Sequence, residues 1–111
     1  MTESVVPNDP LRFILDCLAT GRVLWTYHMN MRMAARAISR RMVMEASVFE
    51  VIESYPEDKY MPSYLVFARH GGTVFHLLFA TDIINNNVRL VAAYHPSSTV
   101  WNDDMKTRRA T

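Results

Sequence analysis

The stretch YLVFARHGGTVFHLLFA, residues 64–80, decides the fold. Valine, leucine, phenylalanine and tyrosine dominate both of its ends, and the pair Gly71-Gly72 interrupts it. Residues of this kind favour strands, and a glycine pair between two apolar runs is a strong hairpin signal. The sequence therefore predicts two antiparallel strands, at residues 64–68 and 73–80.

A third strand is expected at residues 88–94, after a turn that contains Asn85, Asn86 and Asn87. Asparagine tolerates the positive φ of tight turns better than most residues. Because short turns join antiparallel neighbours, the three strands form a meander with residues 73–80 in the middle.

Alternation along the middle strand separates its two faces. Phe75, Leu77 and Phe79 share one face, which we expect to meet the helices. The opposite face, with His76 and Leu78, is left partly open and is apolar enough to receive a partner or a ligand. The helix residues expected against the first face are Leu15, Leu18, Val48 and Ile52.

Helical patterns precede the sheet. Asp9 and Pro10 suit an N-cap and a first helical position, and Gly21 suits the position that ends a helix. A short extended piece follows at residues 23–26, and a second helix is predicted at residues 28–37.

A third helix is expected to begin after Ser39 and to end at Pro56. Its predicted apolar face consists of Met44, Val48, Val51, Ile52 and Tyr55. After the sheet, Ser97 and Ser98 suit the cap of a short closing helix around Trp101, and residues 105–111 are expected to fray.

Helices first and sheet second indicate an α+β fold, with the N-terminal helices packed on one face of a small antiparallel meander sheet. The 111 residues suffice for one domain. We expect its ordered core at about residues 9–104, with flexible termini. Cys17, as the single cysteine, allows no intrachain disulfide, and the N-terminus lacks the pattern of a signal peptide. A cytoplasmic protein without a membrane span is therefore predicted.

The charges are segregated along the chain, although the formal net charge is only +1. Residues 22–41 contain five arginines and no acid, whereas residues 42–58 contain five acids and no base. A cationic helix without acidic residues of its own is a candidate anion-binding surface. In the alternative interpretation, its arginines are structural and tie the helix to the sheet or to Glu50 and Glu53 of the acidic segment, or they are simply solvated.

His28, Arg32 and Arg36 are spaced four residues apart, so their side chains lie along one stripe of a helix. Arginine binds phosphate through two hydrogen bonds, and histidine moves a proton near neutral pH. RNA cleavage by the 2′-hydroxyl needs a proton acceptor, a proton donor and cations. We therefore predict that this stripe lines a groove for RNA, next to the end of the strand that carries Tyr94.

Two further candidates for proton transfer lie on the strands, His76 and Tyr94. The alternatives are a hydrogen-bonded core histidine and an edge aromatic. No cofactor and no metal is expected, because the histidines lack HExxH or CxxC companions. The predicted catalytic residues are His28, Arg32, Arg36, His76 and Tyr94, and the predicted RNA-binding residues are Arg32, Arg36, Arg40 and Arg41.

The pattern His28-x3-Arg32-Met33-x2-Arg36-x-Ile38-Ser39 resembles the hallmark of a family of small bacterial proteins classed as a domain of unknown function. In that family the usual pattern is His, then Arg-Met, then Arg-Gly-Ile-Ser. Ala37 stands where the family often has glycine, and His95 where it often has glutamate. Further matches cover about residues 20–109, at Tyr55-Pro56-Glu57-Asp58, His76-Leu77-Leu78, Ala93-Tyr94-His95-Pro96, Trp101 and Arg108-Arg109.

This resemblance implies a fold similar to RelE/ParE-type toxins and the MqsR group, with helices against a curved antiparallel sheet. Members often resemble the toxin halves of toxin–antitoxin pairs, and related toxins cut mRNA without a metal. The implied function is a toxin-like, metal-independent endoribonuclease that acts on RNA and has a small antitoxin protein as its partner. Two alternatives stay open: a non-catalytic protein-interaction module that uses the open sheet face or the cationic helix, and a small-molecule binder.

Overall fold

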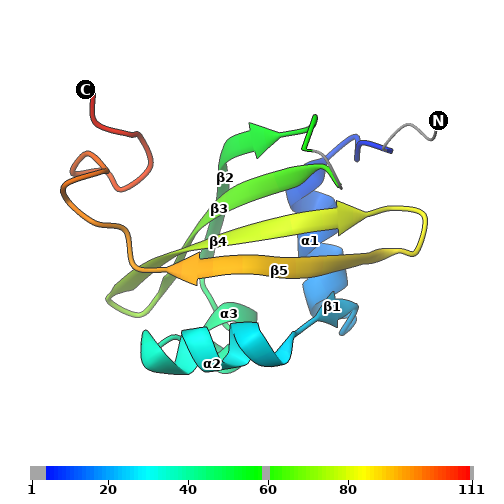
Figure 1. Ribbon diagram of the computed structural model, residues 1–111, viewed down its shortest axis with the longest axis horizontal. Helices are drawn as coiled ribbons and strands as arrows, with labels where there is room; N and C mark the ends of the chain where they lie inside the picture. The colour runs from blue at the N-terminus through cyan, green and yellow to red at the C-terminus, as the bar shows by residue number, and fades with distance from the viewer. Residues whose placement is uncertain (1–4, 59–60, 111) are drawn as a thin grey trace.

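The computed structural model describes residues 5–58 and 61–110; the expectations for residues 1–4 and 111 lie outside this range (Figure 1). Five strands form one sheet in the order β1-β5-β4-β3-β2. β1 runs parallel to β5, and the other three neighbouring pairs are antiparallel, so the sheet is mixed. The strands are β1 (Val23–Leu24), β2 (Val48–Tyr55), β3 (Ser63–His70), β4 (Thr73–Asp82) and β5 (Asn87–Tyr94).

The predicted meander of three strands is confirmed, and β4 lies between β3 and β5. In the turn between β3 and β4, Gly71 has a φ of 59°, which a glycine adopts without steric cost. In the turn between β4 and β5, Asn86 has a φ of 56°. Local turn chemistry therefore sets the centre of the sheet.

The predicted third helix is wrong over most of its length. Only α3 (Arg40–Met44) is helical, capped by the Ser39 side chain, and the chain from Val48 onward is an edge strand paired with β3. Val48, Val51 and Ile52 have helical spacing, but β-branched residues also favour strands, and here β3 supplies the hydrogen-bonding partner.

A β-bulge between Val51 and Glu53 explains the helix-like spacing within this strand. Glu50 and Glu53 pair with Phe67 and Leu65 of β3. Both carboxylates therefore lie on the same face of the sheet although their positions are three apart, which a regular strand would not allow.

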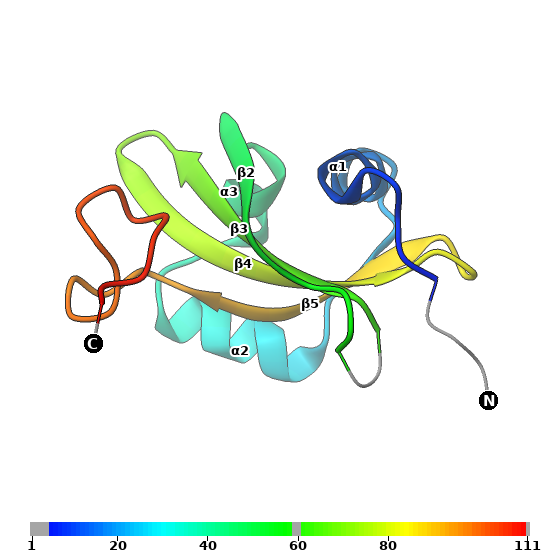
Figure 2. The ribbon, with the colours of Figure 1, turned by 90° about the horizontal axis from the view of Figure 1, so that it is seen from above.

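Helices α1 (Pro10–Ala19) and α2 (Tyr27–Ala35) confirm the first two predicted helices, with small shifts at their ends. The Asp9 carboxylate accepts a hydrogen bond from the Arg12 backbone, and Gly21, with a φ of 73°, follows the last turn of α1. Figure 2 shows α1 and α3 on one side of the sheet and α2 beside β5 on the other side, so the helices do not share one face. Within the described residues, no helix is both long and apolar enough to cross a membrane.

Helix α2 ends in a Schellman motif at Ala37, whose φ is 56°. The Ile38 N–H donates to the Met33 carbonyl at 2.9 Å, and the Ala37 N–H donates to the Ala34 carbonyl at 3.2 Å. The side chains of Ile38 and Met33 are both buried. Alanine is strained in this left-handed conformation, which glycine adopts freely.

Most of the core lies on the side of the sheet that α1 and α3 cover, and Met29 and Met33 of α2 belong to the same cluster. Phe75, Leu77 and Phe79 of β4 are fully buried there, as the sequence predicts. From α1, Leu18 is buried in the same cluster and Leu15 packs against it.

The expected contributions of Val48 and Ile52 to this core are wrong. Phe49 and Val51 of β2 pack against the core cluster instead. The reason is the strand conformation, in which alternate residues face the same side of the sheet.

Residues 105–110, for which fraying is expected from the sequence, make contacts to the sheet through Met105, Lys106 and Arg108. Trp101 is buried and forms a β-bridge with Arg108, and no helix surrounds it. A single turn precedes it, in which the N–H groups of Val100 and Trp101 donate to the Ser97 carbonyl. Long-range contacts described below replace the predicted closing helix.

Candidate nucleic-acid interface

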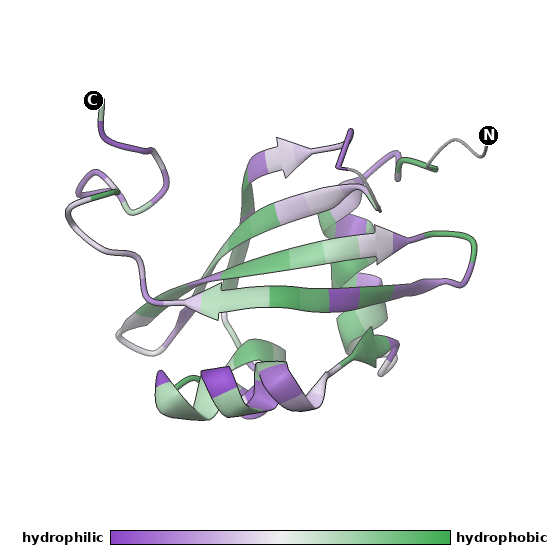
Figure 3. Cartoon of the chain, viewed as in Figure 1, coloured by the Kyte–Doolittle hydropathy of each residue, from purple (hydrophilic) through white to green (hydrophobic). Residues whose placement is uncertain are grey.

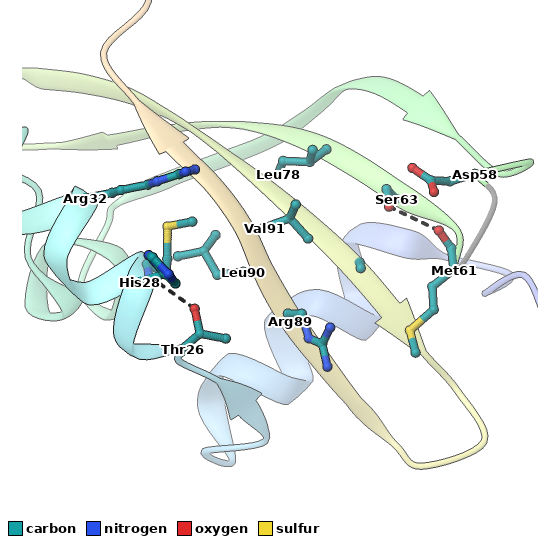
Figure 4. A pocket seen from close by; sticks show the side chains of 12 residues that line it. Thr26, His28, Arg32, Asp58, Met61, Ser63, Leu78, Arg89, Leu90 and Val91 are labelled. Carbon is teal, nitrogen blue, oxygen red and sulfur yellow. Dashed lines mark hydrogen bonds between the residues drawn. The ribbon is translucent and has the colours of Figure 1, made fainter.

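The face of the sheet opposite the core has two halves. Residues 96–109, which we call the C-terminal strap, cover the half near Tyr94; this is the closed half. The other half is open and holds a groove between α2 and strands β3 to β5, with a volume of about 480 Å³ (Figure 4). Figure 3 shows β4 and β5 as largely hydrophobic ribbons and α2 as a mixture of hydrophilic and hydrophobic positions.

The groove combines an apolar floor with cationic walls. Leu78 of β4 and Val91 of β5 form part of the floor. His28 and Arg32 line the groove from α2, and Arg89 lines it from β5. Cations around an apolar surface suit a ligand that carries both negative charge and a flat or apolar part.

Polar groups complete the lining of the groove. The Thr26 and Ser63 hydroxyls lie along it, and Asp58 lies at the end opposite α2. Thr26 is also the N-cap of α2, because its side chain accepts a hydrogen bond from the Met29 N–H at 3.1 Å. The cap therefore fixes the start of the helix that carries the groove histidine.

The packing of α2 orients His28 and Arg32 toward the groove. Met29 and Met33 are buried against the core, whereas His28 and Arg32 are exposed. With one face of a helix fixed by burial, residues four apart on the neighbouring stripe point in one direction. The structure thus brings two members of the predicted stripe to one groove.

Arg36, the third member of the stripe, does not line the groove. Its Nη1 donates to the Ala93 carbonyl at 2.7 Å, and its own carbonyl oxygen lies 2.7 Å from Nε2 of His95. These contacts join the end of α2 to β5 and to the residue that follows β5. Arg36 therefore has a structural contact where phosphate binding was predicted.

The other two arginines predicted to bind RNA also lie outside the groove. Arg40 Nε donates to Asn30 Oδ1 at 3.0 Å, and the guanidinium lies over the Trp25 ring, 4.9 Å from its centroid. Arg41 forms an ion pair with Glu45 at 2.9 Å on α3. Of the four predicted RNA-binding arginines, only Arg32 lines the groove.

Arg89 is a charged groove residue that the sequence interpretation missed. It is exposed between Val88 and Leu90, which are both buried. An arginine at the outward position of an alternating strand was the signal that could have identified it.

His76 lies in the closed half and is fully buried. Nε2 lies 2.6 Å from the Met105 carbonyl and Nδ1 lies 3.2 Å from the Tyr94 hydroxyl. Since a carbonyl only accepts, Nε2 carries the proton and Nδ1 accepts from Tyr94. The Trp101 ring packs edge-on at a centroid distance of 4.5 Å, and burial lowers the pKa of His76.

The predicted catalytic set is therefore not brought together. His76 and Tyr94 bond to each other under the C-terminal strap, while His28 and Arg32 line the open groove. The geometry of His76 is that of a hydrogen-bonded core histidine, which is the alternative interpretation given for this residue. Burial also raises the pKa of Tyr94.

The acidic strand pairs with the C-terminal strap. Lys106 Nζ lies 2.8 Å from Glu50, and Arg108 donates to both carboxylate oxygens of Glu53, at 2.7 and 3.1 Å. These hydrogen bonds hold the pKa of Glu53 below its ordinary value. The predicted alternative, in which Glu50 and Glu53 pair with the arginines of the second helix, is wrong.

Across residues 5–58 and 61–110, no carboxylate lies within ion-pair distance of Arg32 or Arg89. In the same part of the chain, no three His, Cys, Asp or Glu side chains are grouped as metal ligands. Burial raises the pKa of the Cys17 thiol, which lies in the core and away from the groove. The cationic walls are the distinctive feature of this site.

Comparison with known proteins gives a family without an assigned activity. Neither a curated protein nor a solved structure matches the chain. The model of the family DUF4258, a domain of unknown function, matches residues 25–100. The matched range contains α2, the meander and all the groove residues named above. Since it covers well over half of the chain, the protein belongs to the DUF4258 family.

Proposed function

We propose that the open groove binds RNA and that the protein is a toxin-like, metal-independent endoribonuclease, similar in fold to RelE/ParE-type toxins. The observation that supports this proposal is the convergence of His28, Arg32 and Arg89 on one groove with an apolar floor. A small antitoxin protein would be its partner.

Each groove residue has a role in this proposal. Arg32 and Arg89 hold phosphate oxygens and offset the negative charge that develops during cleavage. The floor at Leu78 and Val91 receives a base. His28 accepts the 2′-hydroxyl proton as the 2′-oxygen bonds to phosphorus and the bond to the 5′-oxygen breaks. Solvent supplies the proton for the departing 5′-oxygen, because the groove is open.

The first experiment measures the affinity for a labelled RNA oligonucleotide as a function of salt, with a chelator present. Each phosphate contact that is lost flattens the dependence of log affinity on log salt by about one unit. Arg32→Ala and Arg89→Ala should each flatten it, and Arg41→Ala is the matched control, because Arg41 lies outside the groove and pairs with Glu45. An equal effect of all three variants would show that general charge, not the groove, binds RNA.

The second experiment separates cleavage from binding. His28→Ala should abolish cleavage of the same RNA and leave its affinity nearly unchanged, while Arg32→Lys should recover binding only in part, since lysine cannot bind phosphate bidentately. RNA binding without cleavage by the unmodified protein would remove the nuclease part of the proposal. Absence of RNA binding even at low salt would refute both parts.

A further inference from the structure

A second surface of α2 faces away from the groove and is apolar. Tyr27 is 77% exposed, Met31 is 55% exposed, and Ala34 is exposed as well. Their positions, four and three residues apart, place them along one stripe of the helix. We call these three residues the α2 stripe.

The α2 stripe leads into a hollow between α2 and the start of α3, with a volume of about 410 Å³. Ala34 belongs to both, and the other apolar lining comes from Ala37, Met33 and Ile38. A protruding apolar side chain fits such a hollow, whereas a flat lipid surface would leave it unfilled. The shape therefore favours a protein segment over a membrane.

Two arginines lie near the α2 stripe. Arg32 lies on the neighbouring stripe of α2, and Arg40 lines the hollow. Neither has a carboxylate within ion-pair distance among residues 5–58 and 61–110. A second copy of this chain would bring the same arginines face to face, and like charges at an interface are unfavourable. The complementary partner is therefore acidic.

We propose that the α2 stripe and the hollow dock an acidic amphipathic helix of a partner protein. The partner lays apolar side chains spaced three and four residues apart on Tyr27 and Met31 and inserts one of them into the hollow. Its carboxylates lie against Arg40 at the hollow. This surface does not include the floor of the groove, so the inference does not depend on RNA binding there.

The test uses three labelled helical peptides of about 16 residues. One has leucine on a single stripe and glutamate elsewhere, the second has the same leucine positions with lysine, and the third is a scramble of the first. We expect binding of the acidic amphipathic peptide alone. Tyr27→Ser and Met31→Ser should each weaken it about tenfold. Ile84→Ser is the matched control, because Ile84 is 79% exposed and lies in the turn between β4 and β5.

Four outcomes would overturn the inference. The first is no binding of the acidic peptide at low salt, and the second is equal binding of the lysine peptide or the scrambled peptide. The third is an equal loss of peptide affinity in Ile84→Ser, and the fourth is binding of another kind of ligand to the α2 stripe. The last is tested with RNA and with vesicles of phosphatidylserine and phosphatidylcholine. If Tyr27→Ser and Met31→Ser weaken either of these as much as the peptide, the α2 stripe belongs to a nucleic-acid or membrane surface. Both side chains are exposed, so the variants should fold, which their unfolding curves will verify.

Discussion

The two halves of one sheet face place their histidines in opposite environments. In the closed half, His76 of β4 is fully buried, and both ring nitrogens have partners. In the open half, Leu78, two positions further along the same strand, lines a groove beside the exposed His28. The same strands are thus covered where the C-terminal strap reaches them and line an open groove where it does not.

The two halves also differ in how their charged side chains are paired. In the closed half, Glu50 pairs with Lys106 and Glu53 with Arg108, so each acid of β2 has a base from the C-terminal strap. In the open half, the arginines of the groove have no such ion pair within the described range, and an anionic ligand would compensate them. Because both ring nitrogens of His76 have partners inside the protein, its contacts are those of a structural residue.

The largest effect is expected from Trp101 in the closed half. Trp101→Ala should lower the free energy of unfolding by about 3–5 kcal/mol, because the buried ring packs against His76 and leaves a cavity when it is removed. Denaturant unfolding measures the loss. Val100→Ala, at the exposed neighbour, is the control and should cost less than about 1 kcal/mol. Similar losses for both variants would mean that the C-terminal strap does not close this half.

His76 should make stability depend on pH. Burial lowers its pKa in the folded state, so the unfolded state, with a pKa near 6.5, binds the proton more readily. Its contribution to stability is complete above pH 6.5 and is lost as the pH falls toward the lower folded pKa. The slope for this one group is at most about 1.4 kcal/mol per pH unit.

Unfolding free energies measured at several pH values between 5 and 8 test this assignment. His76→Gln should lower stability at pH 8 and flatten the slope between pH 5 and 6.5. If His76→Gln keeps the original slope of unfolding free energy against pH, the pH dependence belongs to another group.

Arg36 and Arg32 should differ although they lie on the same helix stripe. Arg36→Ala should cost about 1–2 kcal/mol of stability, because the Ala93 carbonyl loses a charged donor. Arg32→Ala should change stability by less than about 0.5 kcal/mol, since Arg32 is exposed and lines the groove. Thermal unfolding of both variants checks the contrast, and a larger loss for Arg32 would refute it.

The smallest effect is a gain at the end of α2. Ala37→Gly should stabilise the protein by about 0.5–1 kcal/mol, since glycine removes the strain of a φ of 56°. Chemical denaturation measures the change, and Ala35→Gly, within the helix, should have the opposite sign. A loss of stability at Ala37 would contradict the Schellman geometry.

The parts of the fold that follow from local chemistry could be predicted from the sequence. The Asp9 cap, the glycine turn at Gly71 and the asparagine turn at Asn86 each depend on a few neighbouring residues. β2 could not be predicted in this way, because its bulge gives it the spacing of a helix. The parallel pairing of β1 with β5 depends on contacts that span most of the chain.

The candidate site was predicted only in part, for the same reason. Helical spacing identified His28 and Arg32 as neighbours, and the structure places both at one groove. Helical spacing could not show that Arg36 donates to the Ala93 carbonyl, nor that the C-terminal strap buries His76. Both contacts join residues that are distant in sequence, so spacing within one element contains no information about them.

The most direct test of the contrast removes one arginine from each half. Arg32→Ala and Arg108→Ala change the net charge equally, and both unfolding and the salt dependence of RNA affinity are measured on each variant. We predict that Arg32→Ala flattens the salt dependence by about one unit and leaves stability unchanged. Arg108→Ala should keep the salt dependence and lower stability by about 1 kcal/mol, through loss of the Glu53 ion pair. Equal flattening by both variants, or a loss of stability confined to Arg32→Ala, would contradict the division into a closed folding half and an open binding half.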